Sequence, residues 1–366
     1  MGGSGHSHLL KILHVDPEKN WGGGEAQVLG LLTYLSDKGH HNALLAHPHG
    51  RLFEKCRHSN VEKIPLYMRN DLDLSPVAAL RRLIRKEKYD IVHLHTKRAH
   101  ALSLWLPRGP NTPRYVVTRR MDYPEPKSWY TRYLYNRRVD GIVAISRPIA
   151  DLLASAGVDS KRIRLIHSGI DPAPFEAVAS MDTREEDSAV VGTVAVLEER
   201  KGHRFLLEAA ARLKKQGYKI SYQLAGDGSL RRQLEEMAER LSLKEHVTFA
   251  GFVSDTPRFL AGVDIFVLPS LYEGLGIAAL EAMAARKVVV AARAGGLTEV
   301  VVDSVTGFLC TPRDAEGLAR VIAKLVKEKS LARDMGKRGA ARVREQFTLE
   351  RMASQNEAFY YELLEA

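Results

Sequence analysis

The fold of this chain is decided by residues 264–283, which read DIFVLPSLYEGLGIAALEAM. Residues 265–268 form an apolar run stopped by a proline, which predicts a buried strand of a parallel sheet. Gly274 and Gly276 then open an apolar helix. Ligands of open α/β sheets bind outside the carboxyl ends of the strands, so this bend is a candidate binding site.

Two carboxylates, Glu273 and Glu281, bracket the bend. Its glycines allow a ligand to approach the backbone, and the helix N-terminus offers free N–H groups to an anion. A phosphorylated, hydroxyl-rich ligand fits this arrangement. The local spacing leaves a second interpretation open, a tight turn followed by a solvated helix face.

Length and composition indicate a globular protein of two domains. The chain has 366 residues, of which 45% are hydrophobic and 27% charged. Single cores stop growing at roughly 250–300 residues, so we expect two of them. The two cysteines, Cys56 and Cys310, give neither a disulfide framework nor metal-ligand spacing, which favours a reducing compartment. No apolar run approaches the length of a membrane span.

The net charge of +10 is concentrated in the first half of the chain. Residues 1–180 contain 27 Lys and Arg against 17 Asp and Glu, whereas residues 181–366 contain 27 of each. A one-sided positive field suits an anionic partner such as a membrane surface, an acidic glycolipid or a nucleic acid. A basic surface that serves only solubility is the alternative.

Strand patterns alternate with amphipathic helices in two series, which predicts two doubly wound parallel sheets. The expected strands of the first series are residues 9–15, 42–46, 91–94, 115–118, 141–145 and 164–166. Those of the second are residues 190–195, 221–225, 247–250, 265–268, 288–291 and 307–309. We expect domains at 9–171 and 188–345, joined through residues 169–174 and the acidic run 182–187. Residues 1–8 are excluded from the fold.

The E-x7-E spacing inside "EGLG…ALEAMA" resembles the donor-site motif of retaining GT-B glycosyltransferases of family 4. The resemblance extends from Trp21 to the last helix. It implies two Rossmann-like domains facing a central cleft, with residues 349–366 returning as a helix to the first domain. It also implies transfer of a sugar from a nucleotide-sugar to an acceptor hydroxyl with retention, without a metal and without a cofactor. A UDP-sugar is favoured over a GDP- or ADP-sugar.

The resemblance assigns roles to individual residues. Glu273 would face the transferred sugar, Glu281 would bind the ribose, and Lys201 would stabilise the departing diphosphate. The family has Gly-Arg a few residues before this lysine, where this chain has Ala195-Val196. We therefore propose that Arg200 supplies the missing charge. A solvated Arg-Lys pair in a loop is the alternative.

Other loops match the donor side of the family. Gly22, Gly23 and Glu25 match a W-G-G-x-E loop that touches the donor diphosphate and the acceptor. The turn alone is weak evidence, because it has neither a Walker lysine nor a G-x-G-x-x-G spacing. The remaining donor-side residues are expected to be Gly226, Asp227, Phe252, Val253, Gly274, Leu275, Gly276 and Glu299.

Four residues are expected on the acceptor side besides the glycine-rich loop. His93 and His95 lie two apart on a strand and therefore share one face. A metal would need further ligands, so lining of the cleft is preferred, as for the family's H-x-H. Arg119 and Arg120 suggest a phosphate or carboxylate on the acceptor. Charge matching to Asp122 and Glu125 is their alternative role.

Two basic segments, residues 80–86 and 127–138, could contact a membrane, since basic residues beside Trp and Tyr suit an anionic interface. A plain amphipathic surface helix is the alternative. We find no nucleic-acid module and expect no nucleic-acid partner. The expected acceptor is an anionic glycolipid or glycan, such as a lipopolysaccharide core intermediate. The expected location is cytoplasmic, with peripheral contact to the inner face of the membrane as a hypothesis.

Two other functions remain open from the sequence. A nucleotide-sugar epimerase of the hydrolysing type shares the fold and would form an epimer without any acceptor. A non-catalytic carbohydrate or nucleotide binder is suggested by the absence of the arginine at Val196. Such a protein would bind a nucleotide without turnover.

Overall fold

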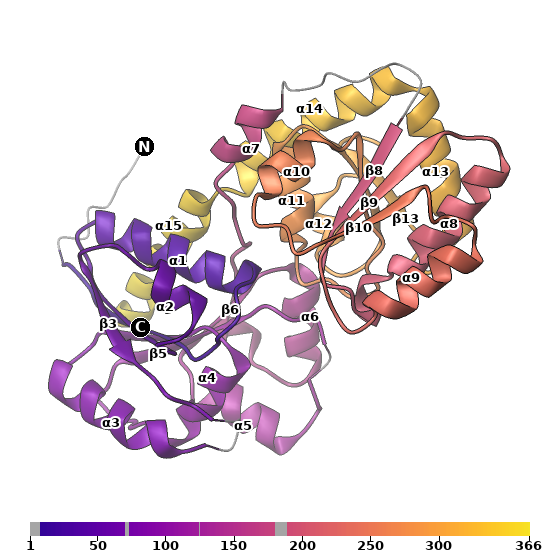
Figure 1. Ribbon diagram of the computed structural model, residues 1–366. Coiled ribbons are helices and arrows are strands. Elements are labelled where there is room, and N and C mark those ends of the chain that lie inside the picture. The colour runs from indigo at the N-terminus through magenta and orange to yellow at the C-terminus, as the bar shows by residue number, and fades with distance from the viewer. Residues whose placement is uncertain (1–7, 70–72, 124, 180–188) are drawn as a thin grey trace. The chain divides into compact units, whose positions relative to one another are not determined.

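The computed structural model describes residues 8–69, 73–123, 125–179 and 189–366 (Figure 1). The chain divides into two compact units. The first extends to Gly169 and includes Leu349–Ala366, and the second is Ile170–Thr348. The acidic run 182–187 and residues 1–7 lie outside the described residues.

The first unit contains a seven-stranded sheet in the order β3-β2-β1-β4-β5-β6-β7, and every neighbouring pair is parallel. Strands β4 and β6 are buried along their whole length, as expected when helices cover both faces. The strands are β1 (Lys11–Asp16), β2 (His41–Ala46), β3 (Val61–Pro65), β4 (Ile91–Leu94), β5 (Arg114–Arg119), β6 (Gly141–Ala144) and β7 (Ile163–Leu165).

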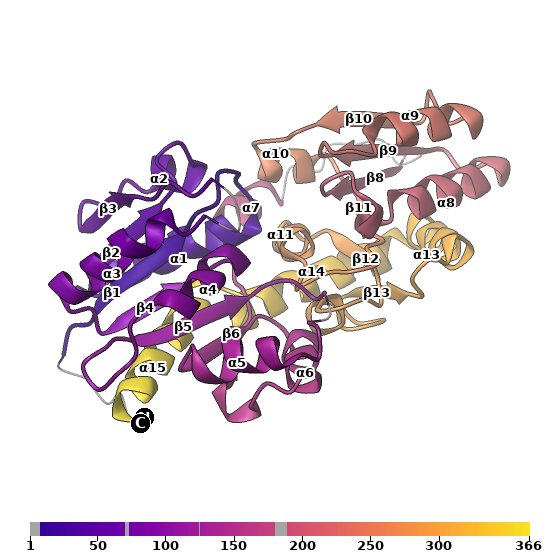
Figure 2. The same ribbon diagram turned by 90° about the horizontal axis from the view of Figure 1, so that it is seen from below.

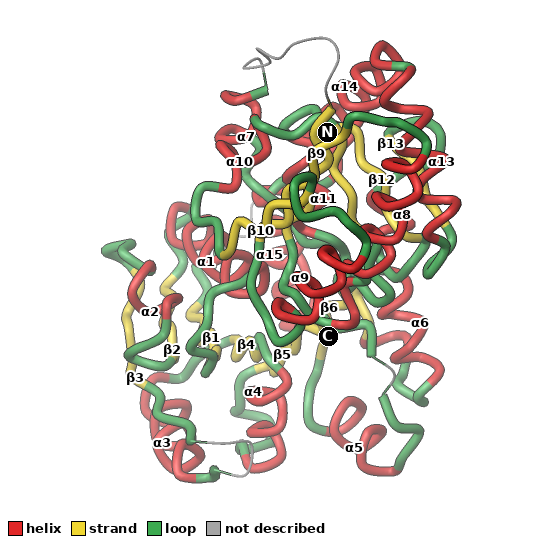
Figure 3. Tube along the Cα trace, turned by 45° about the vertical axis from the view of Figure 1, so that its right-hand side comes forward, coloured by secondary structure: helices red, strands yellow, loops and turns green. Residues whose placement is uncertain are grey.

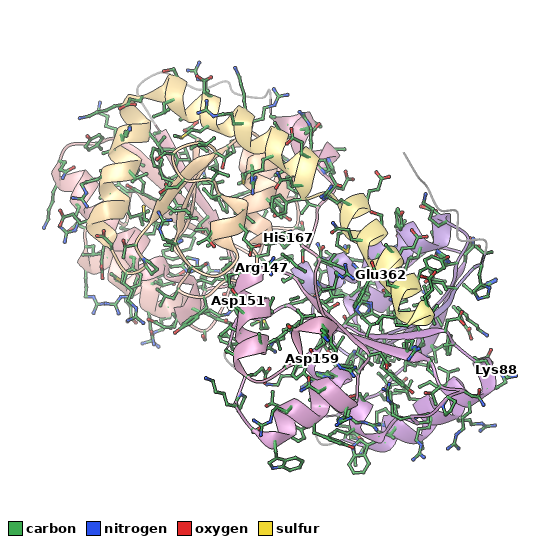
Figure 4. All side chains as sticks on the ribbon, turned by 180° about the vertical axis from the view of Figure 1, so that it is seen from behind. Lys88, Arg147, Asp151, Asp159, His167 and Glu362 are labelled. Carbon is green, nitrogen blue, oxygen red and sulfur yellow. The ribbon has the colours of Figure 1, made fainter. Side chains whose placement is uncertain are left out.

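The helices of this unit include one from the far end of the chain. They are α1 (Gly23–Asp37), α2 (Arg51–Lys55), α3 (Ser75–Glu87), α4 (Lys97–Leu102), α5 (Trp129–Arg137), α6 (Arg147–Ser155) and α15 (Leu349–Glu365). Figure 2 shows α15 among the elements of the first unit. In this helix, Phe359 and Tyr360 join the same apolar core as Leu31 and Leu35 of α1. On the same helix, Glu362, which is labelled in Figure 4, forms an ion pair with Arg164 of β7.

The second unit contains a six-stranded parallel sheet in the order β10-β9-β8-β11-β12-β13 (Figure 3). The strands are β8 (Ala189–Val194), β9 (Ile220–Ala225), β10 (Val247–Gly251), β11 (Ile265–Leu268), β12 (Val288–Ala292) and β13 (Gly307–Cys310). The helices are α7 (Ala173–Val178), α8 (His203–Lys215), α9 (Arg231–Arg240), α10 (Thr256–Ala261), α11 (Ile277–Ala284), α12 (Leu297–Val300), α13 (Ala315–Lys327) and α14 (Lys329–Gln346).

The prediction of two doubly wound parallel sheets is confirmed. The elements that were not predicted include β3, α14 and the short helices α7 and α12, which lie where a connection and a loop were expected. The edge strand β3 reads VEKIP and carries charges where a central strand has apolar residues, and α14 is highly charged with two internal glycines. In the described part of the chain, no helix is long and apolar enough to cross a membrane.

The strand orders place one switch point in each sheet. β1 lies between β2 and β4, and β8 lies between β9 and β11, so the connections on either side of these strands run in opposite directions. Loops that follow β1 and β4, or β8 and β11, therefore lie next to each other at the carboxyl edge. Such points are where open α/β sheets bind their ligands.

Candidate functional site

A buried ion pair lies at the switch point of the second unit. Lys201 Nζ donates to Glu273 Oε2 over 2.6 Å, and Ser270 Oγ donates to the same oxygen over 3.0 Å. The two charged side chains are only 11% and 12% exposed. Residues 72 positions apart are thus brought together, because β8 and β11 are neighbours in the sheet.

Backbone contacts hold the loops of this pair in place. The amide of Leu271 donates to the carbonyl of Arg200 over 2.7 Å. Gly202 has a φ of +67°, and a Cβ at this position would come well under 3.0 Å from the carbonyl oxygen of Pro269. Only glycine satisfies both constraints, so the residue after Lys201 sets how closely the two loops approach.

The bend that opens α11 is also built on close backbone approach. Gly276 precedes the helix with a φ of +101°, and the amide of Gly296 donates to the carbonyl of Glu273 over 3.0 Å. A Cβ on Gly296 would come under 3.0 Å from the carbonyl of Gly274. The loop after β12 is therefore packed directly on the bend.

Two other expected donor-side residues lie in this region. The side chain of Leu275 is buried in the core, so only its backbone is presented to a ligand. Glu299 lies half-buried on α12, and its carbonyl accepts from Arg342.

Glu281 differs from Glu273 in having no partner for its carboxylate among the described residues. It lies on α11, within two turns of the helix start, and is half-buried. Burial raises its pKa to about 7. A half-buried carboxylate without a partner can accept hydrogen bonds from hydroxyl groups of a ligand. These bonds would offset part of the free energy lost on burial.

The other loops of this edge are tied together by their backbones. Arg200 Nε donates to Glu198 over 2.8 Å, so its guanidinium is already paired. The amide of Gly226 donates to the carbonyl of Gly251, and the amide of Leu197 donates to the carbonyl of Asp227. Next to these contacts, Phe252 is 75% exposed and Val253 is half-buried.

In the first unit, the glycine-rich loop leads directly into α1. The helix begins at Gly23, with Gly22 extended before it. The side chain of Glu25 folds back, so that its Oε2 would lie 3.3 Å from a Cβ on Gly22. Asp16, the last residue of β1, is buried close by, and burial together with the charge of Glu25 raises its pKa to about 7.

The structure separates the roles of Arg119 and Arg120. Arg119 is buried, forms an ion pair of 2.9 Å with Glu125, and donates to the carbonyl of Tyr123 over 3.0 Å. Our expectation that both arginines face an anionic acceptor is therefore corrected, since Arg119 is neutralised inside the unit. Arg120 lies against Gly24, with its Cδ 3.4 Å from where a Cβ would be.

His93 and His95 are buried rather than exposed to a ligand, which corrects the expectation of cleft lining. His93 hydrogen-bonds through Nδ1 to Tyr360 Oη (2.6 Å) and through Nε2 to Thr118 Oγ1 (2.7 Å). His95 Nε2 lies 3.0 Å from Nδ1 of His14. Burial lowers the pKa of all three imidazoles, to about 4 for His14.

These three histidines are close enough together to hold a metal ion. Both ring nitrogens of His93 already have hydroxyl partners, and His14 Nε2 is paired with Asn42. The cluster is therefore a hydrogen-bonded network of neutral imidazoles that connects β1, β2, β4 and β5 with α15.

The two basic segments are placed differently from one another. In α3 the apolar residues Val77, Leu80 and Ile84 are buried, and the basic residues that follow along the helix are exposed. In α5 Trp129 is 72% exposed, whereas the adjacent Arg138 is used internally, donating to the carbonyls of Ser103 and Leu106. Arg138 is thus corrected from a surface contact to a structural residue.

Four residues of these networks were not predicted, namely His14, Asp16, Gln27 and Tyr360. Gln27 forms two hydrogen bonds with the backbone of Gly169, the last residue of the first unit before the chain leaves it. Asp16 could have been predicted, because an aspartate at the end of a buried strand lies at the edge of the sheet where ligands bind. The partners of the others lie at least 28 residues away, so local pattern could not identify them.

Comparison with known proteins gives a consistent result. Residues 180–342 match the family described as glycosyl transferases group 1, and residues 21–174 match glycosyltransferase family 4. Lipopolysaccharide core biosynthesis glycosyltransferase LpsE of Rhizobium meliloti (strain 1021) is 32% identical over 355 residues, which cover 93% of this chain and 96% of LpsE.

Solved structures share the fold. A glycosyltransferase from Rickettsia africae ESF-5 superposes with a TM-score of 0.83 at 22% identity, covering 97% of this chain and 99% of its own. Anabaena HepE, solved with UDP and glucose, gives a TM-score of 0.81 at 22% identity, covering 96% and 100%.

Proposed function

Because this chain belongs to the group 1 and family 4 glycosyltransferases, with the GT-B fold, we propose that it is a retaining, metal-independent hexosyltransferase. It moves a sugar from a nucleotide-sugar to an acceptor hydroxyl. The observation that carries the proposal is the buried Lys201–Glu273 pair at the switch point, in the same loop-to-helix segment as the unpartnered Glu281.

In the proposed reaction, the acceptor oxygen bonds to the anomeric carbon as the bond from that carbon to the diphosphate breaks. An oxygen of the leaving diphosphate accepts the hydroxyl proton on the same face of the sugar. Lys201 stabilises the charge that grows on the diphosphate, with Arg200 as a second cation. In this front-face reaction no carboxylate acts as a nucleophile, and Glu273, whose Oε2 accepts from Lys201 and Ser270, positions the sugar.

The remaining donor contacts follow from the same edge of the sheet. Glu281 accepts hydrogen bonds from the ribose hydroxyls, and Gly274 and Gly276 let the backbone amides at the start of α11 approach the phosphates. Phe252 and Val253 lie at the end of β10, where they can contact the base. UDP is the favoured nucleotide, supported by HepE, whose structures contain UDP and UDP-glucose.

The proposed acceptor is a lipid-linked or cell-envelope glycan, such as lipopolysaccharide core. The similarity to LpsE supports this choice. The exposed cations Arg81, Arg82 and Arg85 on α3 and the exposed Trp129 on α5 support peripheral contact of a cytoplasmic enzyme with an anionic membrane.

A saturation-transfer NMR screen of nucleotide-sugars, varying base and sugar, tests the donor site. We expect one donor to bind wild-type protein and to bind Glu281→Ala at least tenfold more weakly. Failure of every nucleotide-sugar to bind protein shown to be folded by circular dichroism would overturn the proposal. Formation of an epimer without acceptor would assign the site to an epimerase instead.

A further inference from the structure

A groove that the proposed reaction does not use lies between α8 and α9 of the second unit, two helices that pack beside each other (Figure 2). It has a volume of about 360 Å³ and is lined by residues of α9, of the first turn of α8 and of the loop before α8. The described residues that line it do not include Lys201, Glu273 or Glu281. Its volume lies at the lower end of the roughly 300–1,000 Å³ that is typical of small-molecule sites.

One wall of the groove is an apolar stripe along α9. It consists of Leu230, Leu234, Met237 and Leu241, which recur at helical spacing and therefore share one face. Leu234 is buried, and the other three are half-buried and packed against the core of the second unit. The apolar body of a ligand can cover the surface of this stripe that is still exposed to solvent.

His203, in the first turn of α8, adds a buried polar group to the lining. The residue is 2% exposed, and neither Nδ1 nor Nε2 has a hydrogen-bond partner among the residues that the structure describes. Burial, together with the charge of Lys201, lowers its pKa to about 4, so the imidazole is neutral near pH 7. A neutral imidazole has one donor and one acceptor, and leaving both without a partner in a buried position is unfavourable.

The charged groups around the groove balance one another. The lining contains two carboxylates, of Glu198 and Glu199, and two guanidinium groups, of Arg204 and Arg240. The groove therefore has no excess of either sign with which to attract an anion or a cation. An uncharged hydroxyl or amide group both donates and accepts, so it can pair with either ring nitrogen of His203.

We propose that this groove is a regulatory site for an uncharged small molecule, whose apolar body packs on the α9 stripe and whose hydroxyl or amide group hydrogen-bonds to His203. The occupant is thus defined by a ring-sized apolar part and one neutral polar group. Its binding does not depend on the proposed function, whereas its effect on the donor site does.

The loop before α8 connects the groove with the candidate donor site. Glu198 lines the groove and accepts from Arg200, and Gly202 lines it directly after Lys201, packed against the carbonyl of Pro269. A ligand in the groove stabilises this arrangement of the loop, and the arrangement holds both cations that face the diphosphate. Occupancy therefore strengthens UDP binding, and UDP strengthens the binding of the ligand by the same factor.

NMR of the full chain labelled with isotope-enriched histidine tests the site through the ring nitrogens of His203. The probes are benzyl alcohol and acetanilide, with toluene as the analogue without a polar group and benzoate and benzylamine as charged analogues. We expect benzyl alcohol or acetanilide to shift the His203 resonances and to bind about tenfold more tightly than the other three. At saturation this probe should lower the Kd for UDP by about fivefold or more.

Gln233→Trp fills the groove from an exposed position of α9 without replacing a core residue. Arg232→Trp is the matched control, because this side chain is 91% exposed on the same helix and does not line the groove. We expect only Gln233→Trp to abolish binding of the probe and its effect on UDP. His203→Phe keeps an aromatic ring without the nitrogens, so it should bind toluene and benzyl alcohol equally.

The proposal is overturned if no probe shifts the His203 resonances, or if toluene or a charged analogue binds as tightly as benzyl alcohol and acetanilide. It is equally overturned if the two tryptophan variants behave alike, if His203→Phe still prefers the polar probes, or if the bound probe leaves the Kd for UDP unchanged. Failure of wild-type protein to bind UDP would instead contradict the proposed function, and binding at His203 would still be measured without the nucleotide.

Discussion

Lys201 and Glu273 form an ion pair of 2.6 Å that joins the loop after β8 to the loop after β11. Both side chains are largely buried, and the carboxylate accepts a second hydrogen bond from Ser270. Removing one member of such a pair leaves the other uncompensated. The pair therefore contributes both to the shape of the site and to the charge available for the reaction.

Replacing Lys201 by alanine is expected to lower kcat by about 10²–10³, the usual cost of losing one preorganised charge in an active site. Arg200→Ala is the matched change, and we expect about a tenfold loss, since that guanidinium is paired with Glu198 and partly exposed. Steady-state kinetics with the donor found by NMR measures both. Turnover of Lys201→Ala within threefold of wild type, in a folded protein, would remove the lysine from the mechanism.

Glu281→Gln should stabilise the protein at high pH while weakening ribose binding. Burial raises the pKa of Glu281 to about 7, so the folded wild type binds a proton that the unfolded chain releases near pH 4.5. Wild-type stability is thus lost as the pH rises through this window. The glutamine variant avoids that loss, and its advantage should grow to at most about 3 kcal/mol by pH 8.

The measurement is Tm at pH 4.5 and at pH 8 for both proteins. If the difference in Tm between variant and wild type is the same at the two pH values, Glu281 is not a buried carboxylate with a raised pKa.

Gly202→Ala should destabilise the second unit and disturb the position of Lys201. Gly202 and Gly217 both have a left-handed backbone, with φ of +67° and +84°. A Cβ at Gly217 meets nothing within 4 Å, whereas one at Gly202 clashes with the carbonyl of Pro269. Gly217→Ala should therefore cost only the backbone term of about 1–2 kcal/mol, and Gly202→Ala clearly more.

Tm measures the loss of stability, and the Kd for UDP measures whether Lys201 has been displaced. Only Gly202→Ala is expected to weaken UDP binding, and equal behaviour of the two variants would argue against a spacing role for Gly202.

Wild-type protein should bind vesicles that contain about 30% anionic lipid at low salt and dissociate as salt screens the charges. Reversing Arg81, Arg82 and Arg85 to glutamate should weaken binding at least tenfold, since each cation near such a surface contributes about 1 kcal/mol. Trp129→Ala, combined with these changes, should weaken vesicle binding further. Co-sedimentation measures all of these.

The control reverses the exposed cations Arg212, Lys215 and Lys337 of the second unit. Equal loss in both triple variants would show a nonspecific effect of net charge, and no loss in either would rule out docking through α3.

Much of the fold could be predicted because its determinants are local. Apolar runs identified most strands of both sheets, and the strand at 265–268 was predicted with the bounds that the structure has. The edge strand β3 and the charged helix α14 escaped because charged residues obscure their periodicity.

What the sequence alone determined is the alternation of strands and helices, the glycine positions and the segment that carries Glu273 and Glu281, because these depend on neighbours in the chain. The tertiary structure decided which charged groups are paired. Arg119 ends β5 and Arg120 follows it, and this adjacency in the chain does not show that Glu125 pairs with Arg119. The Lys201–Glu273 pair likewise depends on β8 and β11 becoming neighbours, and that is set by packing between distant residues.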